Sequence, residues 1–208
     1  LIYNKNGQNI DLTYQGGITF KTNKPIKVGT DFKVEVTNDV ECYIYVFGEE
    51  TDGSNYVLFP YTAKHSPYCG ITGTRVFPND HSLYADDKGS TDRIAVVVTK
   101  QPLDYNKLSK AISNASGYNY EQKVKNALEG ELVTNVDFKG GKTFSFQCNT
   151  GTKNAVAAIL EFDKNTQVVA KVLEGTQLNF TRLRGANIIN GLLFWIDQTN
   201  EPRVVNIE

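Results

Sequence analysis

The 208-residue chain contains no methionine and only one tryptophan, two histidines and three cysteines. Because the sequence begins at Leu1 and has no initiator methionine, we expect a mature form or an excised part of a longer protein. A signal peptide or a catalytic domain upstream of Leu1 would then be missing from this sequence. The role of the intact protein therefore has to be inferred from one part of it.

The three cysteines, Cys42, Cys69 and Cys148, lie far apart, which excludes the closely spaced pairs typical of zinc sites. Because their number is odd, at least one thiol stays unpaired within the chain, and we expect no disulfide framework. Cys42 and Cys148 fall in apolar strand patterns, where cysteine is commonly a small buried hydrophobic residue.

Neither sign of charge is in excess, since 22 lysines and arginines stand against 23 aspartates and glutamates. Without a broad basic surface, nucleic acid is not an expected partner. Long apolar runs are absent as well, because the longest, such as residues 94–98, have strand length. A membrane-spanning helix needs roughly 18 apolar residues. We therefore expect a soluble globular protein without a membrane span.

Strand patterns dominate the first half of the chain. Residues 32–36 alternate apolar and charged side chains, which predicts a half-buried strand. Residues 42–47 are apolar at every position, as is typical of an inner strand covered on both faces. A turn at Gly53 leads into a second strand over 56–59, and a β-branched buried strand follows over 93–100.

Two short amphipathic helices are predicted within residues 104–130, the first of them capped by Asp104. Beyond residue 130 strand patterns return, with turns expected at 140–141 and 163–165. The strands expected there cover 132–138, 143–148, 155–162, 167–173, 177–180, 192–196 and 204–207. Short strands without alternating helices favour a mainly β fold, an antiparallel sandwich with a two-helix insertion.

A resemblance to a known family rests on an aromatic strand, a Leu-Phe-Pro return and a late apolar strand before Pro-Leu. The matching residues are FKVEV at 32–36, YIYVF at 43–47, Gly53, VLFP at 57–60, VFP at 76–78, DRIAVVV at 92–98 and Pro-Leu at 102–103. The stretch 32–103 thereby resembles DUF4384, a bacterial domain of unknown function that is often attached C-terminal to caspase-like peptidase domains.

The resemblance implies an immunoglobulin-like accessory domain without assigned catalysis. The sequence leaves its compartment open between the bacterial cytoplasm and the periplasm. We accordingly expect one β-rich unit over residues 1–208. Within it, residues 20–103 form the family-like sandwich core, 104–130 the helical insertion, and 131–208 further strands of unassigned type. The resemblance supplies no functional residues to carry over.

One cluster of residues could support thiol chemistry. Cys69 lies near both histidines, His65 and His81, and a thiol needs a neighbouring imidazole to become a nucleophile, which Asp80 could orient. The sequence has no oxyanion-hole or nucleophile-turn signature around them. The alternative is that Cys69 and the histidines are ordinary loop residues. A metal site from the same residues lacks the four closely spaced ligands of structural zinc.

Four aspartates, Asp80, Asp86, Asp87 and Asp92, could supply oxygen ligands to calcium. The regular ligand spacing and the terminal bidentate glutamate of a calcium loop are missing, which favours solvated loop carboxylates. No cofactor is expected from any motif in the chain.

Aromatic residues in loops suggest a binding surface instead. Tyr61, Tyr68 and Tyr84, with Trp195 as a further candidate, could form a stacking platform, although aromatic residues of a sandwich usually fill its core. We therefore expect a noncatalytic accessory or binding module that contacts a protein partner, or a neighbouring domain of the same polypeptide, through residues 61–92. The alternatives are a Cys-His thiol hydrolase that uses Cys69 and a glycan-binding β-sandwich.

Overall fold

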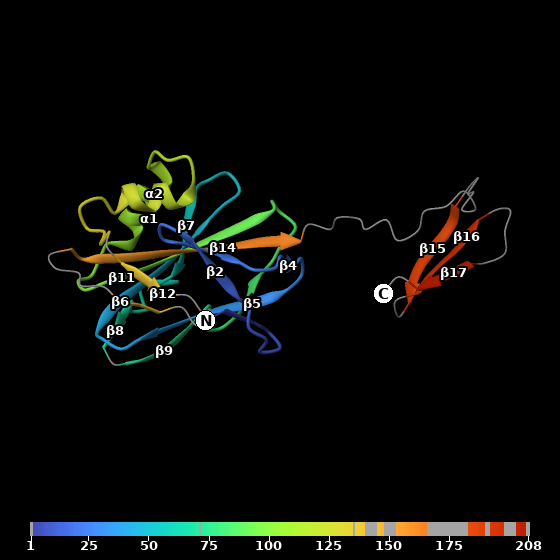
Figure 1. The fold of residues 1–208 in the computed structure, drawn as a ribbon, viewed down its shortest axis with the longest axis horizontal. Coiled ribbons are helices and arrows are strands. Elements are labelled where there is room, and N and C mark those ends of the chain that lie inside the picture. Colours follow the sequence, from blue (N-terminus) through green and yellow to red (C-terminus); the bar gives the residue numbers. More distant parts are fainter. Residues whose placement is uncertain are drawn as a thin grey trace. The chain divides into compact units, whose positions relative to one another are not determined.

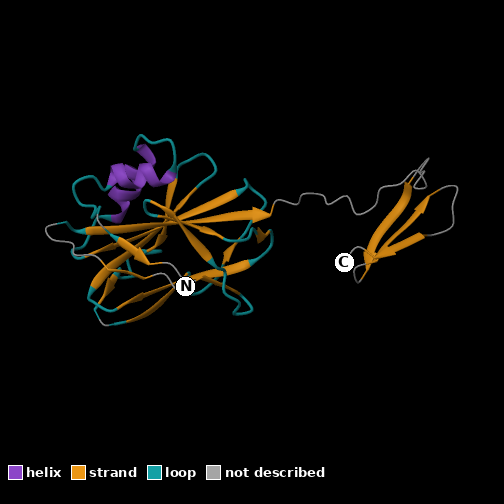
Figure 2. Cartoon of the chain, viewed as in Figure 1, coloured by secondary structure: helices purple, strands orange, loops and turns teal. Residues whose placement is uncertain are grey.

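The structure is a computed structural model that describes residues 2–70, 72–134, 136–139, 145–147, 153–165, 183–189, 192–197 and 203–206. The chain divides into two compact units, residues 1–166 and 167–208. The described residues are mainly β, with two helices among them, as the sequence predicted (Figures 1 and 2). The single unit expected over residues 1–208 stays a prediction, because compactness does not say whether the two units unfold together.

Strand β5 (Asp31–Asn38) is the centre of the smaller sheet in the first unit. It pairs antiparallel with β1 (Ile2–Asn4), β9 (Gly73–Phe77) and β10 (Leu83–Tyr84). Phe32 and Val34 are buried while Lys33 and Glu35 are only partly buried, which confirms the predicted alternation.

The larger sheet of the first unit contains the longest strands. In spatial order its main strands are β2 (Leu12–Gly16), β3 (Thr19–Thr22), β14 (Ala155–Asn165), β11 (Thr91–Thr99), β6 (Cys42–Glu49) and β7 (Asn55–Phe59). Two short strands extend it, because β4 (Ile26–Lys27) pairs with β14 and β8 (Tyr68–Cys69) pairs with β6. The turn at Gly53 joins β6 to β7 as expected, with Gly53 at a φ of 80°.

Strand β6 is covered on both faces, as its continuous apolar run predicted. Ile44 and Val46 contribute to a core cluster that also contains residues of β5 and β9 from the smaller sheet. Tyr45 and Phe47 point the other way, into a second cluster that contains residues of both helices. In Figure 1 the helices accordingly lie on one side of the larger sheet, and β5 and β9 lie on the other.

Strand β14 departs from the sequence prediction in two ways. The turn expected at residues 163–165 is wrong, because β14 continues through Asn165 and Lys164 is buried within it. The expected antiparallel arrangement holds only in part, because β14 runs antiparallel to β11 but parallel to β3 and β4. The polar run 163–165 has the composition of a turn, and only the long-range pairing of Lys164 explains its burial.

The two helices, α1 (Tyr105–Asn114) and α2 (Tyr120–Ala127), are short and packed on the larger sheet (Figure 2). Asp104 caps α1 as predicted, since its side chain accepts a hydrogen bond from the backbone N of Lys107. Asn119 caps α2 through the backbone N of Gln122. Buried apolar residues then hold both helices against the sheet.

Asn55, the first residue of β7, connects both helices to the edge of the larger sheet. Its backbone N donates to the Ser113 hydroxyl at 2.9 Å, and its side-chain amide donates to the Ser109 hydroxyl at 2.9 Å. The Tyr120 hydroxyl donates to Asn55 Oδ1 at 2.6 Å. Burial raises the pKa of Tyr120, which is 1% exposed, far above its usual range.

Replacing Tyr120 with phenylalanine should lower the free energy of unfolding by about 1–2 kcal/mol, because the partly buried Asn55 oxygen loses its donor while the ring keeps its packing. The matched control is Tyr118→Phe, since Tyr118 is 90% exposed. Urea unfolding followed by far-UV circular dichroism measures both. Equal stability of the two variants would show that this hydrogen bond does not anchor α2.

Further strands are present beyond α2. β12 (Asp137–Lys139) and β13 (Ser145–Gln147) pair antiparallel, as expected for the predicted hairpin. In the second unit β15 (Leu183–Ile189), β16 (Leu192–Asp197) and β17 (Arg203–Asn206) form an antiparallel sheet in that order. The sequence predicted β16 and β17 but missed β15, and the expected strands at 167–173 and 177–180 lie outside the described residues.

Candidate functional site

The segment 61–92 connects β7 to the start of β11 and contains three short strands, β8 on the larger sheet and β9 and β10 on the smaller sheet. Pro60 and Pro78 follow β7 and β9, each after a cis peptide bond. We call this stretch the loop segment. It contains the tyrosines, histidines and aspartates that the sequence indicated as candidates. The further aromatic candidate, Trp195, lies outside it.

Tyr61 is the anchor of the loop segment. Its hydroxyl accepts a hydrogen bond from the backbone N of Asn79 at 2.8 Å, and its ring packs edge-on against Phe59, with ring centres 5.5 Å apart. Burial raises the pKa of Tyr61. The residue is therefore a structural support on the rim of the core rather than an open stacking platform.

The two histidines gather around the Tyr61 ring. The centre of the His65 ring lies 5.2 Å from that of Tyr61 and the centre of the His81 ring 6.1 Å away. His65 Nδ1 shares a hydrogen bond with the Thr62 hydroxyl, whereas His81 Nδ1 lies 2.7 Å from Asp80 Oδ1. The hydrogen bond from His81 lowers the pKa of the exposed Asp80. His65, His81 and Asp80, three of the four residues of the cluster considered from the sequence, therefore lie near one another.

Cys69 lies apart from that grouping. Its sulfur accepts a hydrogen bond from Arg75 Nε at 2.9 Å, faces the carbonyl oxygen of Pro67 at 3.7 Å, and is buried in the core cluster between the two sheets. Each histidine has another hydrogen-bond partner, as described above. The Cys-His arrangement needed for a thiol nucleophile is not among the contacts of the described residues. Cys148 lies outside them.

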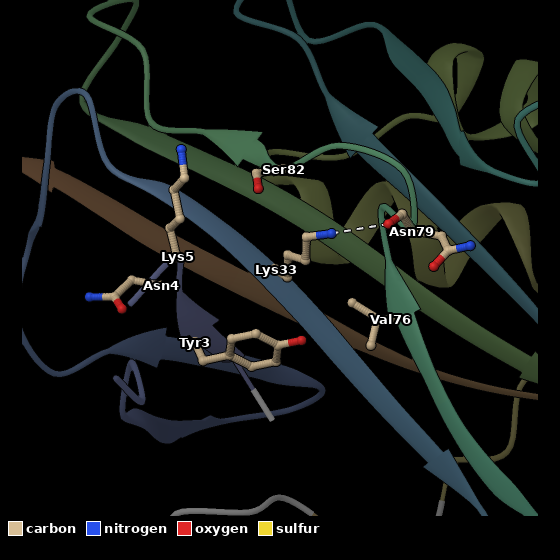
Figure 3. A pocket seen from close by; sticks show the side chains of 7 residues that line it. All are labelled: Tyr3, Asn4, Lys5, Lys33, Val76, Asn79 and Ser82. Atoms are coloured by element: carbon tan, nitrogen blue, oxygen red, sulfur yellow. Dashed lines mark hydrogen bonds between the residues drawn. The ribbon is translucent and has the colours of Figure 1, made fainter. Parts of the chain in front are cut away.

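A hollow of about 340 Å³ opens beside the loop segment, on the outer face of the smaller sheet (Figure 3). Lys33 points from β5 to the loop and donates a hydrogen bond to the Asn79 carbonyl oxygen at 3.1 Å. The backbone N of Asn79 also donates a hydrogen bond to the Tyr61 hydroxyl, so both backbone polar groups of Asn79 are hydrogen-bonded to side chains. The lining residues are Tyr3, Asn4, Lys5, Lys33, Val76, Asn79 and Ser82.

The lining of the hollow is rich in hydrogen-bond donors. It has two ammonium groups, two amides and two hydroxyls, and no carboxylate is found among these seven described residues. The ammonium of Lys5 pairs with Asp31 at 3.6 Å, but the Lys5 side chain is 77% exposed, so solvent screens that pair. Such a lining suits a carboxylate or a backbone carbonyl of another chain.

The sequence pointed to the loop segment but not to the hollow. The alternation over 32–36 places Lys33 on the outer face of its strand, which was the one available signal. Tyr3, Asn4 and Lys5 lie on or beside β1, whose three residues have no readable pattern. Only the pairing of Tyr3 with Lys33 across β1 and β5 brings them to the site.

Two of the four candidate calcium ligands bind a lysine instead. Lys164 Nζ lies 2.6 Å from Asp86 Oδ1 and 2.8 Å from Asp92 Oδ1, and its side chain is 0% exposed. Among the described residues, no group of three or more potential metal ligands could hold an ion, Asp87 and Asp80 included. The ammonium of Lys164 therefore occupies the position between Asp86 and Asp92 at which the sequence suggested calcium.

The pKa values around Lys164 follow from this arrangement. Burial opposes the charge of Lys164, but the hydrogen bonds to both carboxylates outweigh it and raise its pKa. Burial likewise opposes the charge of Asp86, but the bond to Lys164 lowers its pKa overall. For Asp92, burial prevails and the pKa is raised. The three groups form one coupled ionic cluster.

The other predicted binding tyrosines have separate surroundings. Tyr68 is 43% exposed on β8 and packs against Tyr43, with ring centres 5.2 Å apart. Tyr84 is 58% exposed on β10, in the smaller sheet. Trp195 belongs to β16 of the second unit. Tyr61, Tyr68 and Tyr84 therefore have different neighbours, and their contacts do not describe one aromatic row.

A second hollow, of about 460 Å³, lies between the β2–β3 turn and the start of α2. Its charged groups are paired with one another or with nearby residues: Arg93 with Glu161 and Glu49, and Lys125 with Glu121. The exposed Tyr118 is also part of its lining.

Residues 26–102 match the family model of a domain of unknown function, DUF4384. The matched residues cover the resemblance seen in the sequence from β5 to Pro102, which follows β11, and leave out only Leu103. Neither the curated proteins nor the solved structures contain a match. No helix among the described residues has the length and apolar character that crossing a membrane requires.

Proposed function

We propose, on the basis of the DUF4384 match over residues 26–102, that this chain is a noncatalytic accessory module of a larger bacterial protein, such as a caspase-like peptidase. In this proposal it contacts a protein partner, or a neighbouring domain of the same polypeptide, through the loop segment. The first unit would be an immunoglobulin-like β-sandwich. The sandwich architecture is supported by the apolar cluster that β5 and β9 share with β6, β11 and β14.

The observation that carries the proposal is the hollow under Asn79. Its wall is held in place from both sides by Lys33 and Tyr61, so a partner would meet a preformed surface. Two ammonium groups without a carboxylate in the lining favour a partner segment that presents a carboxylate. This makes an acidic surface loop or peptide the best-fitting contact.

The alternative of a thiol hydrolase has less support. Its nucleophile would be Cys69, which is 1% exposed and hydrogen-bonded to Arg75 rather than to a histidine. A substrate would have to enter the core cluster to reach the sulfur. Covalent labelling of native Cys69 by a thiol-directed electrophile at neutral pH, within seconds, would revive this alternative.

The glycan-binding alternative now rests on Tyr118 rather than on the predicted tyrosines. Tyr118 is 90% exposed beside the polar second hollow, as a ring that stacks on a sugar would be. A glycan array discriminates glycan binding from the proposed protein contact. Binding of the wild-type chain to the array that is lost in Tyr118→Ala would favour the glycan-binding function.

Exchanging both lysines of the hollow for alanine should weaken the binding of acidic peptides about tenfold or more, because each charge-assisted hydrogen bond contributes about 1.5–3 kcal/mol. The measurement uses an array of immobilised peptides of equal length and graded acidity, probed with the wild-type chain and with the Lys5→Ala/Lys33→Ala variant.

The control for this array is Lys24→Ala/Lys110→Ala, which removes the same charge from two exposed lysines outside the hollow. Equal weakening by both double variants would mean that net charge, and not the hollow, attracts the peptides. A Tyr68→Ala/Tyr84→Ala variant tests whether the two exposed tyrosines of the loop segment contribute as well. If that variant binds as the wild-type chain does, the tyrosines lie outside the contact surface.

A further inference from the structure

Cys42 and Cys69 face each other across two antiparallel strands. Cys42 begins β6, Cys69 ends β8, and the two residues are directly opposite in the strand register. Both are free and buried, with exposures of 4% and 1%, in the cluster between the two sheets. The two residues are therefore direct cross-strand neighbours.

The backbone geometry of such a pair already fits a disulfide. Residues directly opposite in an antiparallel ladder have Cα atoms about 4.5–5.5 Å apart. Disulfides join residues whose Cα atoms are about 4.4–6.8 Å apart. A bond between Cys42 and Cys69 would therefore need rotation of the two side chains and little movement of β6 or β8.

The two thiols differ in their surroundings, and the difference assigns their roles. Arg75 Nε donates to the Cys69 sulfur at 2.9 Å, so a guanidinium is in place to stabilise negative charge on that sulfur. Burial raises the pKa of Cys42 to about 11, which keeps Cys42 a neutral thiol at physiological pH. Cys69 is thus the sulfur suited to attack first, and Cys42 the sulfur suited to resolve.

We propose that Cys42 and Cys69 are a redox-modification site, which low-molecular-weight disulfides oxidise to an intrachain disulfide linking β8 to β6. In the first step, the Cys69 thiol gives its proton to a base from solvent, attacks one sulfur of the small disulfide and displaces one small thiolate. The Cys42 thiol then gives its proton to a base from solvent and attacks the Cys69 sulfur, which releases the second small thiolate. Two protein thiols are oxidised and one small disulfide is reduced to two thiols.

The modification would act on the loop segment. β8 has two residues, and both pair with the first two residues of β6, so few hydrogen bonds hold it in place. A covalent link would fix it to an inner strand of the larger sheet. Because both sulfurs are buried, the reaction waits for β8 to separate from β6, and we expect oxidation over minutes to hours rather than seconds.

The test uses the full chain with Cys148→Ser, which leaves Cys42 and Cys69 as its two thiols. The folded protein is incubated with oxidised glutathione, denatured, alkylated and measured by intact mass and peptide mapping. The expected result is a product with no alkylated cysteine, a mass lower by about 2 Da, and a peptide pair joined through Cys42 and Cys69 that dithiothreitol releases. The melting temperature should rise by roughly 5–10 °C.

Two further variants make the outcome decisive. Arg75→Gln should slow the reaction about tenfold without changing its product, because it removes the cation beside Cys69. Cys42→Ser should stop at a mixed disulfide between Cys69 and glutathione. The proposal is overturned if both thiols are alkylated after the incubation, or if glutathione stays attached in the chain that retains Cys42.

Discussion

Replacing Lys164 with methionine lowers the free energy of unfolding by about 3 kcal/mol. The side chain of Lys164 is 0% exposed and bonds to Asp86, to Asp92 and to the carbonyl oxygen of Lys88. Methionine keeps most of the buried stem but removes the charge, so two carboxylates near each other lose their common cation. Lys164 is the fully buried member of this ionic cluster, and the loss of such a buried, paired charge is strongly destabilising.

Lys21→Met is the matched control for this prediction. Lys21 also bonds to two carboxylates, Glu161 and Asp163, but its side chain is 37% exposed, so the loss should stay below about 1 kcal/mol. Far-UV circular dichroism is the proper signal for both, because the single tryptophan, Trp195, belongs to the second unit. Equal losses of unfolding free energy in the two variants would show that the burial of Lys164 does not make its ion pairs more stabilising than those of Lys21.

The contribution of Lys164 also depends on pH in a defined direction. The folded state raises the pKa of Lys164 above its unfolded value of about 10.4. Its stabilisation is then fully present below that value and is lost as the pH rises through the folded pKa. The difference between the wild-type chain and Lys164→Met should therefore shrink at pH values above about 10.4.

Residues 20–103, the predicted family-like core, should not fold when produced alone, whereas residues 1–166 should unfold cooperatively. β14 lies between β11 and β3 in the larger sheet, and nine residues of β11 pair with it. Without β14, the backbone edge of β11 and buried residues such as Ala95 and Val97 are open to solvent. The removal of α1 and α2 uncovers Tyr45 and Phe47 as well.

Hydrogen exchange of the amides of β11 distinguishes these outcomes. The chain that ends at residue 166 should protect them as the full chain does, and the shorter chain should exchange them at once. A shorter chain that protects β11 would show that β14 is an addition to the family-like core and not part of it.

Local patterns predicted the strands that carry their own signal. β5, β6 and β11 were anticipated because alternation or continuous apolar character is visible within each of them. β1 and β4 are too short for a pattern, and their pairing with β5 and β14 depends on residues far along the chain. The same limit explains the error at 163–165, where Lys164 is buried only because Asp86 and Asp92 lie beside it.

Only part of the candidate site was predicted, because local sequence patterns do not reveal residues that long-range pairing brings together. Tyr61, His65, His81 and Asp80 were predicted as chemistry-bearing loop residues, and the structure brings them together. Their predicted link to Cys69 fails because β8 turns that side chain into the core. The hollow needed the register of β1 on β5, which no local pattern encodes.

The most direct test of the proposed contact surface is hydrogen exchange, measured on this chain alone and within the larger polypeptide that the proposal requires. The account predicts added protection in residues 73–82 and 2–5, which border the hollow, and little change in α1 and α2. Unchanged exchange around the hollow, or protection confined to the helices, would contradict it.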